Sequence, residues 1–486
     1  MGGAVVVEFP SMERVVFYAL PAVGHLMSMV ELGKLLLSQN PSLSITILSP
    51  TLPVEHNLIS SYISSVSSVF PAITFHTLPP VPLLLGNPSN YSNREQIAFE
   101  IVRNNNTNLR KFLQSQSLSC LVSAVILDFF CYSALDVTKS LNIPTYFYFP
   151  TNASALALFL NFPEFDKIAS DSFRNLGTTP FEIPGLFSVP ASSMLEPMLD
   201  RGVSYDEFVN MGAHLARSDG IIINTFESLE SKAVKALRDG TCLPGTPVPP
   251  IYCIGPLIAD RGESNIGGEK NECLSWLDSQ PSRSVVYLGF GSGGVFNKEQ
   301  TREIAIGLER SGVKFLWVVR ATLSADEAKR FQPPSEPDLD SILPDGFLER
   351  TKDRGLIVKS WAPQIEVLGH DAVGGFVTHC GWNSSLEAVC AGVPMVAWPL
   401  YAEQRFNKIL LVEEIGVALP MDESEDWFVK SDEIERRVKQ IIGSEEGDVV
   451  RKRVSDLSHE AKAALGEGGS SKVALAKLVE SWKKEP

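Results

Sequence analysis

Short apolar runs alternate with segments of helical periodicity along the first half of the chain. The runs that predict buried strands are residues 15–20, 44–48, 73–77, 124–127, 145–149 and 220–224. Between the first two runs, apolar residues recur at helical spacing over residues 28–38, which completes a β-α-β unit. Strands that alternate with helices predict a parallel sheet with both faces covered.

The pattern is interrupted over residues 241–268, where proline and glycine are dense. That texture predicts a linker between two domains. The last stretch, residues 449–482, is helical in pattern. In between, a second alternating series has apolar runs at residues 284–288, 314–319, 356–359, 373–377 and 395–398. We therefore expect an α/β protein with two sheets.

The composition places the chain among folded, cytoplasmic proteins. Its 486 residues are enough for two or three domains, and 20% charged with 44% hydrophobic residues is typical of a globular protein. The formal net charge of −15 argues against nucleic acid and anionic membranes as partners. The seven cysteines lack disulfide or zinc spacing, no secretory signal opens the chain, and no apolar run is long enough to span a membrane.

Polar residues gather in residues 361–404, where a strand pattern passes through a short turn into a helical pattern that starts near Asn383. A strand-turn-helix junction exposes backbone N–H groups and the positive end of a helix dipole, which suits a phosphate. Ser384 adds a hydroxyl donor in the same turn, and His379 ends the strand. Glu387 shares the helix face of Asn383, where a carboxylate can accept from two neighbouring hydroxyls such as those of a ribose.

The same stretch resembles the signature box of the plant family-1 UDP-dependent glycosyltransferases, because it opens with W-A-P-Q, contains H-C-G-W-N-S and closes with E-Q. The resemblance implies two Rossmann-like domains that face each other across a cleft, the arrangement called GT-B. Residues 1–247, with a last helix from about 467 to 486, would form the acceptor-binding domain, and residues 248–466 the UDP-sugar-binding domain. Ligands are expected at the carboxyl ends of the strands.

The resemblance also implies a donor site for the UDP-sugar. In the family, the residue that matches Trp361 stacks on the uracil, and those that match Gln364 and Glu387 hold the ribose. The implied site comprises Ser292, Trp361, Ala362, Gln364, His379, Gly381, Trp382, Asn383, Ser384, Glu387, Glu403 and Gln404.

The sugar end of that site is assigned to Trp382, Glu403 and Gln404, again by resemblance. Gln404 favours glucose, because an amide both donates to and accepts from sugar hydroxyls. Two positions depart from the family pattern: Glu403 stands where aspartate is commoner, and Ser385 replaces an aliphatic residue. Neither departure alters the phosphate turn.

No metal ion or other cofactor is expected at the diphosphate. By resemblance, His379, Asn383 and Ser384 bind it, and these donors and the helix dipole would neutralise the leaving group. Asp338-Leu339-Asp340 imitates the D-x-D motif by which other nucleotide-sugar transferases hold a divalent cation. It lies in an acidic loop far in sequence from the phosphate turn, so we interpret it as solvated charge.

His25 and Asp128 are the candidate catalytic residues. His25 stands in a glycine turn after the first strand pattern, and Asp128 ends the apolar run at 124–127. Strand ends of one parallel sheet converge at the same edge, so the two side chains can meet. When each residue is considered by itself, two alternatives stay open: His25 as a helix cap and Asp128 as a structural carboxylate. In the family, the matching histidine takes the proton of the acceptor hydroxyl, and the aspartate stabilises the imidazolium.

A second glycine-rich turn, Gly289-Phe-Gly291-Ser-Gly293-Gly294, follows the apolar run 284–288 and matches a dinucleotide fingerprint. That interpretation expects an acidic residue at the end of the next strand, where the chain has Arg320 instead. Because an arginine suits NADP, an NADP-dependent oxidoreductase stays open as an alternative. In the glycosyltransferases the same loop brings a serine, here Ser292, near the diphosphate.

We therefore expect an enzyme that transfers glucose from UDP-glucose, with inversion, to a hydroxyl of a small plant metabolite, giving a β-O-glucoside. The sequence GHLMSMVELGKLLL after the first strand resembles the branch that acts on flavonoids, chalcones and small phenols. Aromatic side chains at strand ends suit a flat acceptor as well as they suit a core; they are Phe129, Phe130, Tyr148 and Phe149.

The expected partners are the acceptor and UDP-glucose as co-substrate, and the protein is expected to be a monomer. The rival outside the enzymes is a sugar-nucleotide-binding protein without turnover.

Overall fold

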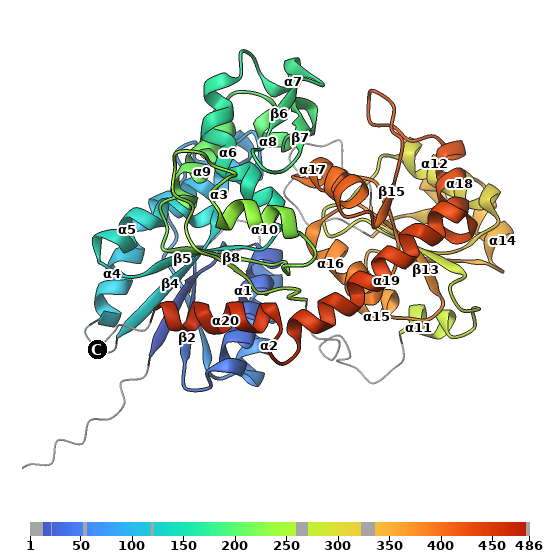
Figure 1. Ribbon diagram of the computed structural model, residues 1–486. Helices are drawn as coiled ribbons and strands as arrows, with labels where there is room; N and C mark the ends of the chain where they lie inside the picture. Colours follow the sequence, from blue (N-terminus) through green and yellow to red (C-terminus); the bar gives the residue numbers. More distant parts are fainter. Residues whose placement is uncertain are drawn as a thin grey trace, which may run out of the picture.

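The computed structural model describes residues 13–20, 22–51, 56–117, 121–258, 271–321 and 336–482. They form two α/β domains that lie side by side, each built around one parallel sheet (Figure 1). Each sheet packs between two clusters of buried hydrophobic residues, so both of its faces are covered by helices. The expected pair of Rossmann-like domains is confirmed.

The first sheet has seven parallel strands in the order β3-β2-β1-β4-β5-β8-β9. All of them except β9 coincide with apolar runs that predict strands, and β4 and β5 are buried along their whole length. The strands are β1 (Arg14–Tyr18), β2 (Ser44–Ser49), β3 (Ile73–Thr77), β4 (Val122–Asp128), β5 (Thr145–Phe149), β8 (Gly220–Ile223) and β9 (Ile251–Cys253).

The helices of the first domain include α6, which is buried along most of its length because it packs against α9 and α10 and because its Phe159 contacts Phe149 of β5. A short antiparallel pair, β6 (Pro180–Glu182) and β7 (Ser188–Pro190), lies outside the sheet. The helices are α1 (Val23–Gln39), α2 (His56–Val69), α3 (Arg94–Asn104), α4 (Asn106–Ser117), α5 (Leu135–Ser140), α6 (Ala153–Ile168), α7 (Phe173–Leu176), α8 (Glu196–Leu199), α9 (Val203–Leu215) and α10 (Ser231–Arg238).

The second sheet has six parallel strands in the order β12-β11-β10-β13-β14-β15. They are β10 (Val285–Gly289), β11 (Lys314–Val319), β12 (Gly355–Lys359), β13 (Val373–Thr378), β14 (Met395–Ala397) and β15 (Ala418–Pro420). The helices are α11 (Glu272–Leu277), α12 (Lys298–Ser311), α13 (Leu339–Ile342), α14 (Phe347–Thr351), α15 (Gln364–Leu368), α16 (Trp382–Ala391), α17 (Gln404–Ile409), α18 (Ser431–Gly443) and α19 (Glu445–Leu465). In the described parts of the chain, no helix has both the length and the apolar character needed to cross a bilayer.

Both sheets contain a topological switch point, where the strand order reverses and loops diverge at the carboxyl edge. In the first sheet it lies between β1 and β4, and in the second between β10 and β13. His25 follows β1 and Asp128 ends β4; the glycine-rich turn follows β10 and His379 follows β13. The candidate residues of each domain therefore stand at its switch point.

The predicted linker over residues 241–268 is corrected by the structure. Ile251–Cys253 forms β9, which pairs with β8 at the edge of the first sheet. The boundary between residues 247 and 248 thus falls before the last strand of the first domain, and the change of domain follows β9. Prolines beside this strand are tolerated because an edge strand leaves one row of N–H groups unpaired.

The last helix returns to the first domain. The predicted helical stretch 449–482 is interrupted between α19 and α20 (Ser470–Ser481), and α20, drawn in red in Figure 1, lies against the first sheet. Leu475 and Leu478 belong to the buried cluster that also contains residues of β1 and β2. The Ser481 hydroxyl lies 2.8 Å from the Tyr146 hydroxyl. Residues after about 467 were assigned to this domain from the sequence, and the packing of α20 agrees with that assignment.

Leu478→Ala should lower the free energy of unfolding by about 2–5 kcal/mol, because it leaves a cavity where a fully buried side chain packed. Urea titration followed by circular dichroism measures the loss. Val473→Ala on the same helix is the matched control, since Val473 is 42% exposed and should change stability by less than about 0.5 kcal/mol. Equal effects of the two changes would contradict the packing of α20.

Candidate active site

His25 and Asp128 meet at the carboxyl edge of the first sheet. His25 Nδ1 lies 2.7 Å from Asp128 Oδ2, so the contact considered from the strand order is present. Asp128 is fully buried, and its Oδ1 accepts the Phe130 N–H at 2.9 Å. The His25 side chain keeps 25% of its surface exposed. The buried carboxylate holds the proton on Nδ1 and leaves Nε2 as the basic nitrogen of the ring.

The surroundings of His25 act on its pKa in opposite directions. Burial lowers the pKa, whereas the charge and hydrogen bond of Asp128, and then the charge of Glu403 from the second domain, raise it. The net result is a pKa raised from the ordinary histidine value. The arrangement therefore stabilises the protonated ring, as a group that accepts a proton during a reaction requires.

Two phenylalanines frame the imidazole. Phe129 stacks beside it at a centroid distance of 5.8 Å, and Phe130 meets it edge-on at 5.2 Å. Phe130 is partly exposed, whereas Tyr148 and Phe149 are fully buried. Of the four aromatic residues considered for an acceptor, Tyr148 and Phe149 thus belong to the core, while Phe129 and Phe130 contact the candidate base.

The second domain presents a strand-turn-helix junction at its switch point. β13 ends at Thr378, Cys380 has a positive φ of 65°, and Gly381 is the N-cap residue of α16. No side chain caps this helix start. Asn383 is exposed and Ser384 half-buried, so both can reach a ligand. The junction has the unpaired donors and the helix dipole that a phosphate site needs.

His379 is enclosed by the two glycine turns. A Cβ atom on Gly291 or Gly381 would overlap its Nε2, so only glycine fits at these positions. His379 is 5% exposed, and its Nδ1 has no hydrogen-bond partner within the described ranges. Burial, and then the charge of Arg320, lowers the pKa of His379 to about 4. A ring with this pKa is neutral near pH 7 and can offer an N–H to a ligand.

The residues expected at the ribose lie together. The Gln364 Nε2 donates to Ser384 Oγ at 2.8 Å and to Glu387 Oε2 at 2.7 Å. Burial raises the pKa of Glu387 to about 7, against the hydrogen bond of Gln364, which lowers it. Trp361 nearby in sequence is 56% exposed and Ala362 is buried, so the indole is open to a stacking partner. A hydroxyl ligand could donate a further hydrogen bond to the half-buried Glu387 carboxylate.

The residues expected at the sugar are all engaged with protein groups. The Trp382 Nε1 donates to the Asn224 carbonyl at 2.7 Å and the indole is buried, so the side chain of Trp382 takes part in the contact between the domains. The Gln404 Oε1 accepts from two backbone N–H groups of the preceding loop, each at 2.9 Å. Glu403 accepts from Thr151 at 3.5 Å, and burial raises its pKa.

Arg320 and Tyr401 contact the glycine-rich turn but were not predicted as site residues. The Arg320 Nη1 donates to the Ser292 carbonyl at 3.0 Å, and no carboxylate of the described chain pairs with this guanidinium. A Cβ on Gly293 would lie 2.9 Å from the Tyr401 hydroxyl oxygen. The one sequence signal for Arg320 was its position at the end of the strand next to the glycine-rich turn.

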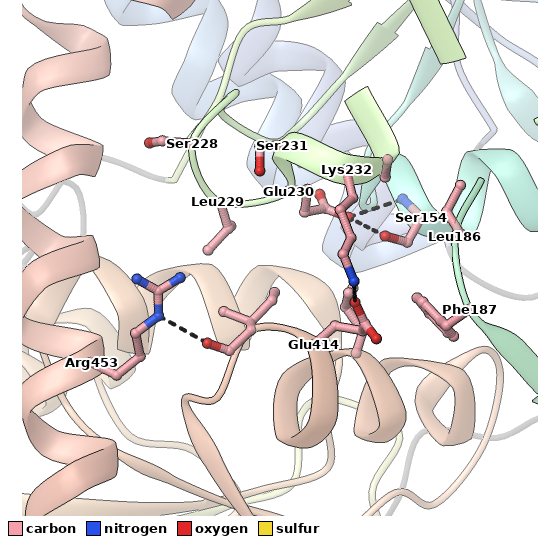
Figure 2. Close-up of a pocket in the computed structure, with 13 residues that line it drawn as sticks. Ser154, Leu186, Phe187, Ser228, Leu229, Glu230, Ser231, Lys232, Glu414 and Arg453 are labelled. Atoms are coloured by element: carbon pink, nitrogen blue, oxygen red, sulfur yellow. Dashed lines mark hydrogen bonds and ion pairs between the residues drawn. The ribbon is translucent and has the colours of Figure 1, made fainter. Parts of the chain in front are cut away.

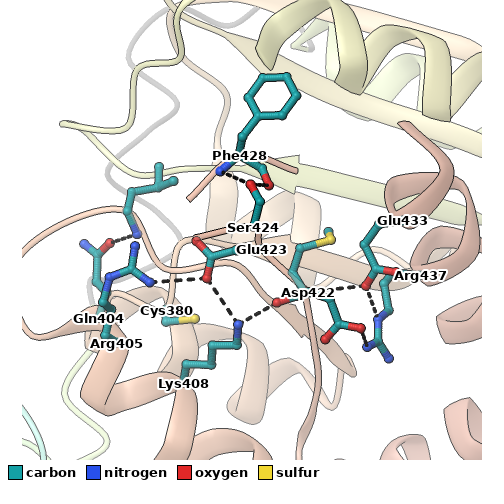
Figure 3. A network of polar contacts seen from close by, with 12 residues as sticks. Cys380, Gln404, Arg405, Lys408, Asp422, Glu423, Ser424, Phe428, Glu433 and Arg437 are labelled. Atoms are coloured by element: carbon teal, nitrogen blue, oxygen red, sulfur yellow. Dashed lines mark hydrogen bonds and ion pairs between the residues drawn. The ribbon is translucent and has the colours of Figure 1, made fainter. Parts of the chain in front are cut away.

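A cluster of charged residues includes two side chains of α17, Arg405 and Lys408 (Figure 3). The Glu423 Oε2 accepts from Arg405 and from Lys408, each at 3.3 Å, and the Glu423 side chain is only 6% exposed. The Arg405 guanidinium lies 3.1 Å from the centroid of the Trp427 ring. The cluster ties the helix that follows Glu403 to the loop between β15 and α18.

Comparison with known proteins agrees with this geometry. Residues 261–461 match the family model of UDP-glucoronosyl and UDP-glucosyl transferases. An anthocyanidin 5,3-O-glucosyltransferase from a Rosa hybrid cultivar is 47% identical, over 97% of this chain and 99% of its own length. A phloretin 2'-O-glucosyltransferase from Malus domestica is 46% identical, over 96% of this chain and 99% of its own.

Solved structures extend the likeness to the fold. Phytolacca americana UGT2, complexed with UDP-2fluoro-glucose and pterostilbene, is 35% identical with a TM-score of 0.86, and the match covers 97% of this chain and 100% of that one. A Medicago truncatula protein complexed with UDP-glucose is 33% identical with a TM-score of 0.81, over 97% of this chain and 98% of that one. This chain belongs to the UDP-glucoronosyl and UDP-glucosyl transferase family, and its two domains have the GT-B arrangement.

Proposed function

We propose that this protein transfers glucose from UDP-glucose to a hydroxyl of a small phenolic or flavonoid-type plant metabolite, with inversion, to give a β-O-glucoside. The observation that carries the proposal is the 2.7 Å contact between His25 and Asp128, on the domain opposite the donor residues. The names of the relatives support it, since they specify anthocyanidin and phloretin glucosylation. So does the complex of the Phytolacca americana protein with UDP-2fluoro-glucose and pterostilbene.

In this reaction His25 Nε2 takes the proton of the acceptor hydroxyl as the oxygen attacks the anomeric carbon. The new carbon–oxygen bond forms on the face opposite UDP, while the bond from the anomeric carbon to the β-phosphate oxygen breaks and its electrons leave with UDP. The α-linked donor therefore gives a β-linked product. The Asp128 carboxylate stabilises the imidazolium through its hydrogen bond to Nδ1.

The departing diphosphate gains negative charge, which the second domain can stabilise without a metal ion. The N-terminus of α16 supplies backbone donors and its dipole, and Asn383 and Ser384 supply side-chain donors. Arg320 adds a positive charge beside the glycine-rich turn, and His379 can donate an N–H to the diphosphate. Asp338 and Asp340 are exposed at the start of α13, so we assign them no metal.

The two alternatives are less well supported. For an NADP-dependent oxidoreductase, Arg320 would have to bind the extra phosphate of NADP, but the family to which the chain belongs is one of sugar transferases. A sugar-nucleotide-binding protein without turnover would not need a partly exposed histidine held in contact with a buried aspartate.

We further propose that the protein acts in the cytoplasm as a monomer, on these two small molecules alone. Five of the described cysteines, Cys131, Cys242, Cys253, Cys273 and Cys380, are buried free thiols, as is usual in a reducing compartment. The net charge of −15 opposes binding to nucleic acid and to anionic membranes.

His25→Ala should lower kcat about 10²–10⁴-fold for weakly acidic acceptors, because general-base assistance is lost. UDP affinity should stay nearly unchanged, and acidic phenols, already partly ionised, should lose less. UDP release across a series of substituted phenols measures both effects. Normal turnover of a weakly acidic acceptor would remove His25 from the mechanism.

Asp128→Asn supplies the companion measurement. It removes the charge that raises the pKa of His25, so the acidic limb of the pH–rate profile should move to lower pH.

Activity should survive an excess of a strong chelator, because the proposed stabilisation of the diphosphate uses only protein groups. The rate of UDP release before and after chelation is the measurement. Loss of activity that Mn²⁺ restores would instead make Asp338 and Asp340 candidate metal ligands.

Arg320→Met should weaken UDP binding about tenfold, or about 1.4 kcal/mol, and leave uridine binding unchanged, because only UDP carries the diphosphate. It should also raise the pKa of His379 above about 4, since one of the two causes that lower it is removed while burial remains. Calorimetry and an NMR titration of His379 measure these changes. Arg354→Met is the matched control, because Arg354 also donates to backbone carbonyls. Arg354 immediately precedes β12, so it lies at the amino ends of the strands, away from the glycine-rich turn at their carboxyl ends. Equal losses for UDP and uridine would argue against a role at the diphosphate.

A further inference from the structure

A chain of hydrogen bonds joins the first domain to the phosphate turn of the second through two asparagines. The Asn152 Nδ2 donates to Asn407 Oδ1 at 2.8 Å, and the Asn407 Nδ2 donates to the Cys380 carbonyl at 2.9 Å. Both asparagines are fully buried. Cys380 immediately precedes the N-cap residue of α16. The amide of Asn407 thus links the first domain to the turn that is proposed to hold the diphosphate.

Asn152 is itself fixed within the first domain. Its Oδ1 accepts the Ala155 N–H at 2.6 Å and so caps α6. The buried carboxylate of Glu230 accepts from the Ala153 N–H at 3.0 Å. It also accepts from the Ser154 N–H at 2.9 Å and from the Ser154 hydroxyl at 2.8 Å (Figure 2). With its oxygen used as the cap, Asn152 directs its NH₂ group across the domain boundary.

Asn407 occupies the equivalent place on the second domain. It lies on α17, one turn after Glu403, and its Nδ2 is also 3.4 Å from Glu403 Oε1. On the other side of the helix, Arg405 and Lys408 are held by Glu423 (Figure 3). The helix is therefore fixed from both sides, and it cannot move relative to the first domain without breaking a buried bond.

The chemistry of the bridge requires an amide on Asn407. This side chain accepts from Asn152 and donates to Cys380 at the same time, which neither a carboxylate nor an aliphatic side chain can do. A second contact between the domains, Lys232 with Glu414 at 2.9 Å, lies at the surface, where Lys232 is 72% exposed and salt screens the pair (Figure 2). The asparagine pair is shielded from water and so constrains the geometry more strongly.

We propose that Asn152 and Asn407 are positioning residues for glucosyl transfer, whose mutual bond aligns the sugar held by the second domain with the base on the first. This inference rests on the proposed roles of His25 and the donor residues. The two reacting groups are carried by different domains, so they meet correctly only when the domains are in register. A misplacement of about 1 Å can cost about 10²-fold in rate. Breaking the bond should therefore lower kcat and spare UDP affinity.

Asn152→Ser is the first test, because serine still caps α6 but is too short to reach Asn407. We expect kcat to fall about 10–10²-fold while the Kd for UDP stays within about twofold. Asn161→Ser is the matched control: Asn161 is a buried asparagine of the same helix whose amide donates to Ala157 and Cys242 carbonyls within the first domain. It should lower the melting temperature similarly and leave kcat near that of the wild type.

A double-mutant cycle with Asn407→Ala isolates the bond. Asn407→Ala removes both hydrogen bonds, so it should lower kcat and also weaken UDP binding, because the Cys380 carbonyl loses its donor. The double variant should have the kcat of Asn407→Ala alone, since the bond that Asn152→Ser breaks is already absent. Losses that multiply would show that the two asparagines act independently and would overturn the inference.

The remaining outcomes separate the inference from the proposed function. If Asn152→Ser turns over as fast as Asn161→Ser, or if its UDP affinity falls in step with kcat, the positioning role is rejected. If the wild type itself releases no UDP with any phenol, the proposed function is rejected instead. Asn152→Asp keeps the cap acceptor and lacks the donor, and it replaces the serine variant if that one does not fold.

Discussion

The buried polar contact between the two domains determines how the halves of the site face each other. Each sheet delivers its own residues to its carboxyl edge, but neither edge holds both a candidate base and a candidate donor site. Apolar surfaces can slide over one another at little cost, whereas a buried amide or indole N–H that loses its acceptor leaves an unpaired polar group. Asn152 with Asn407, and Trp382 with the Asn224 carbonyl, therefore specify one relative position of the domains.

The two histidines of the site show how differently one residue type is used on the two sides. His25 is held by the Asp128 carboxylate, which raises its pKa and prepares it to carry a positive charge. His379 is buried near Arg320, which with burial lowers its pKa to about 4 and keeps it neutral. The positive charge beside the glycine-rich turn thus belongs to Arg320, while His379 shapes the turn through its fit against two glycines.

Much of the fold follows from apolar runs of strand length, because both faces of a parallel sheet are buried. The edge strands β9 and β15 were missed since each is three residues long and has proline within or beside it. The contact of His25 with Asp128 could be anticipated because strand order brings two strand ends together, and the donor residues because they match a family signature. The Asn152–Asn407 bond could not be anticipated, because 255 positions separate the two residues and no local pattern connects them. Nor does any local pattern predict that the Trp382 N–H donates to the Asn224 carbonyl, because 158 positions separate these two residues.

The return of α20 to the first domain means that the chain passes between the domains twice, once after β9 and once between α19 and α20. A second connection limits how far the two domains can separate or rotate relative to each other. The entropy lost in bringing their carboxyl edges together is therefore smaller than for domains joined by one stretch of chain.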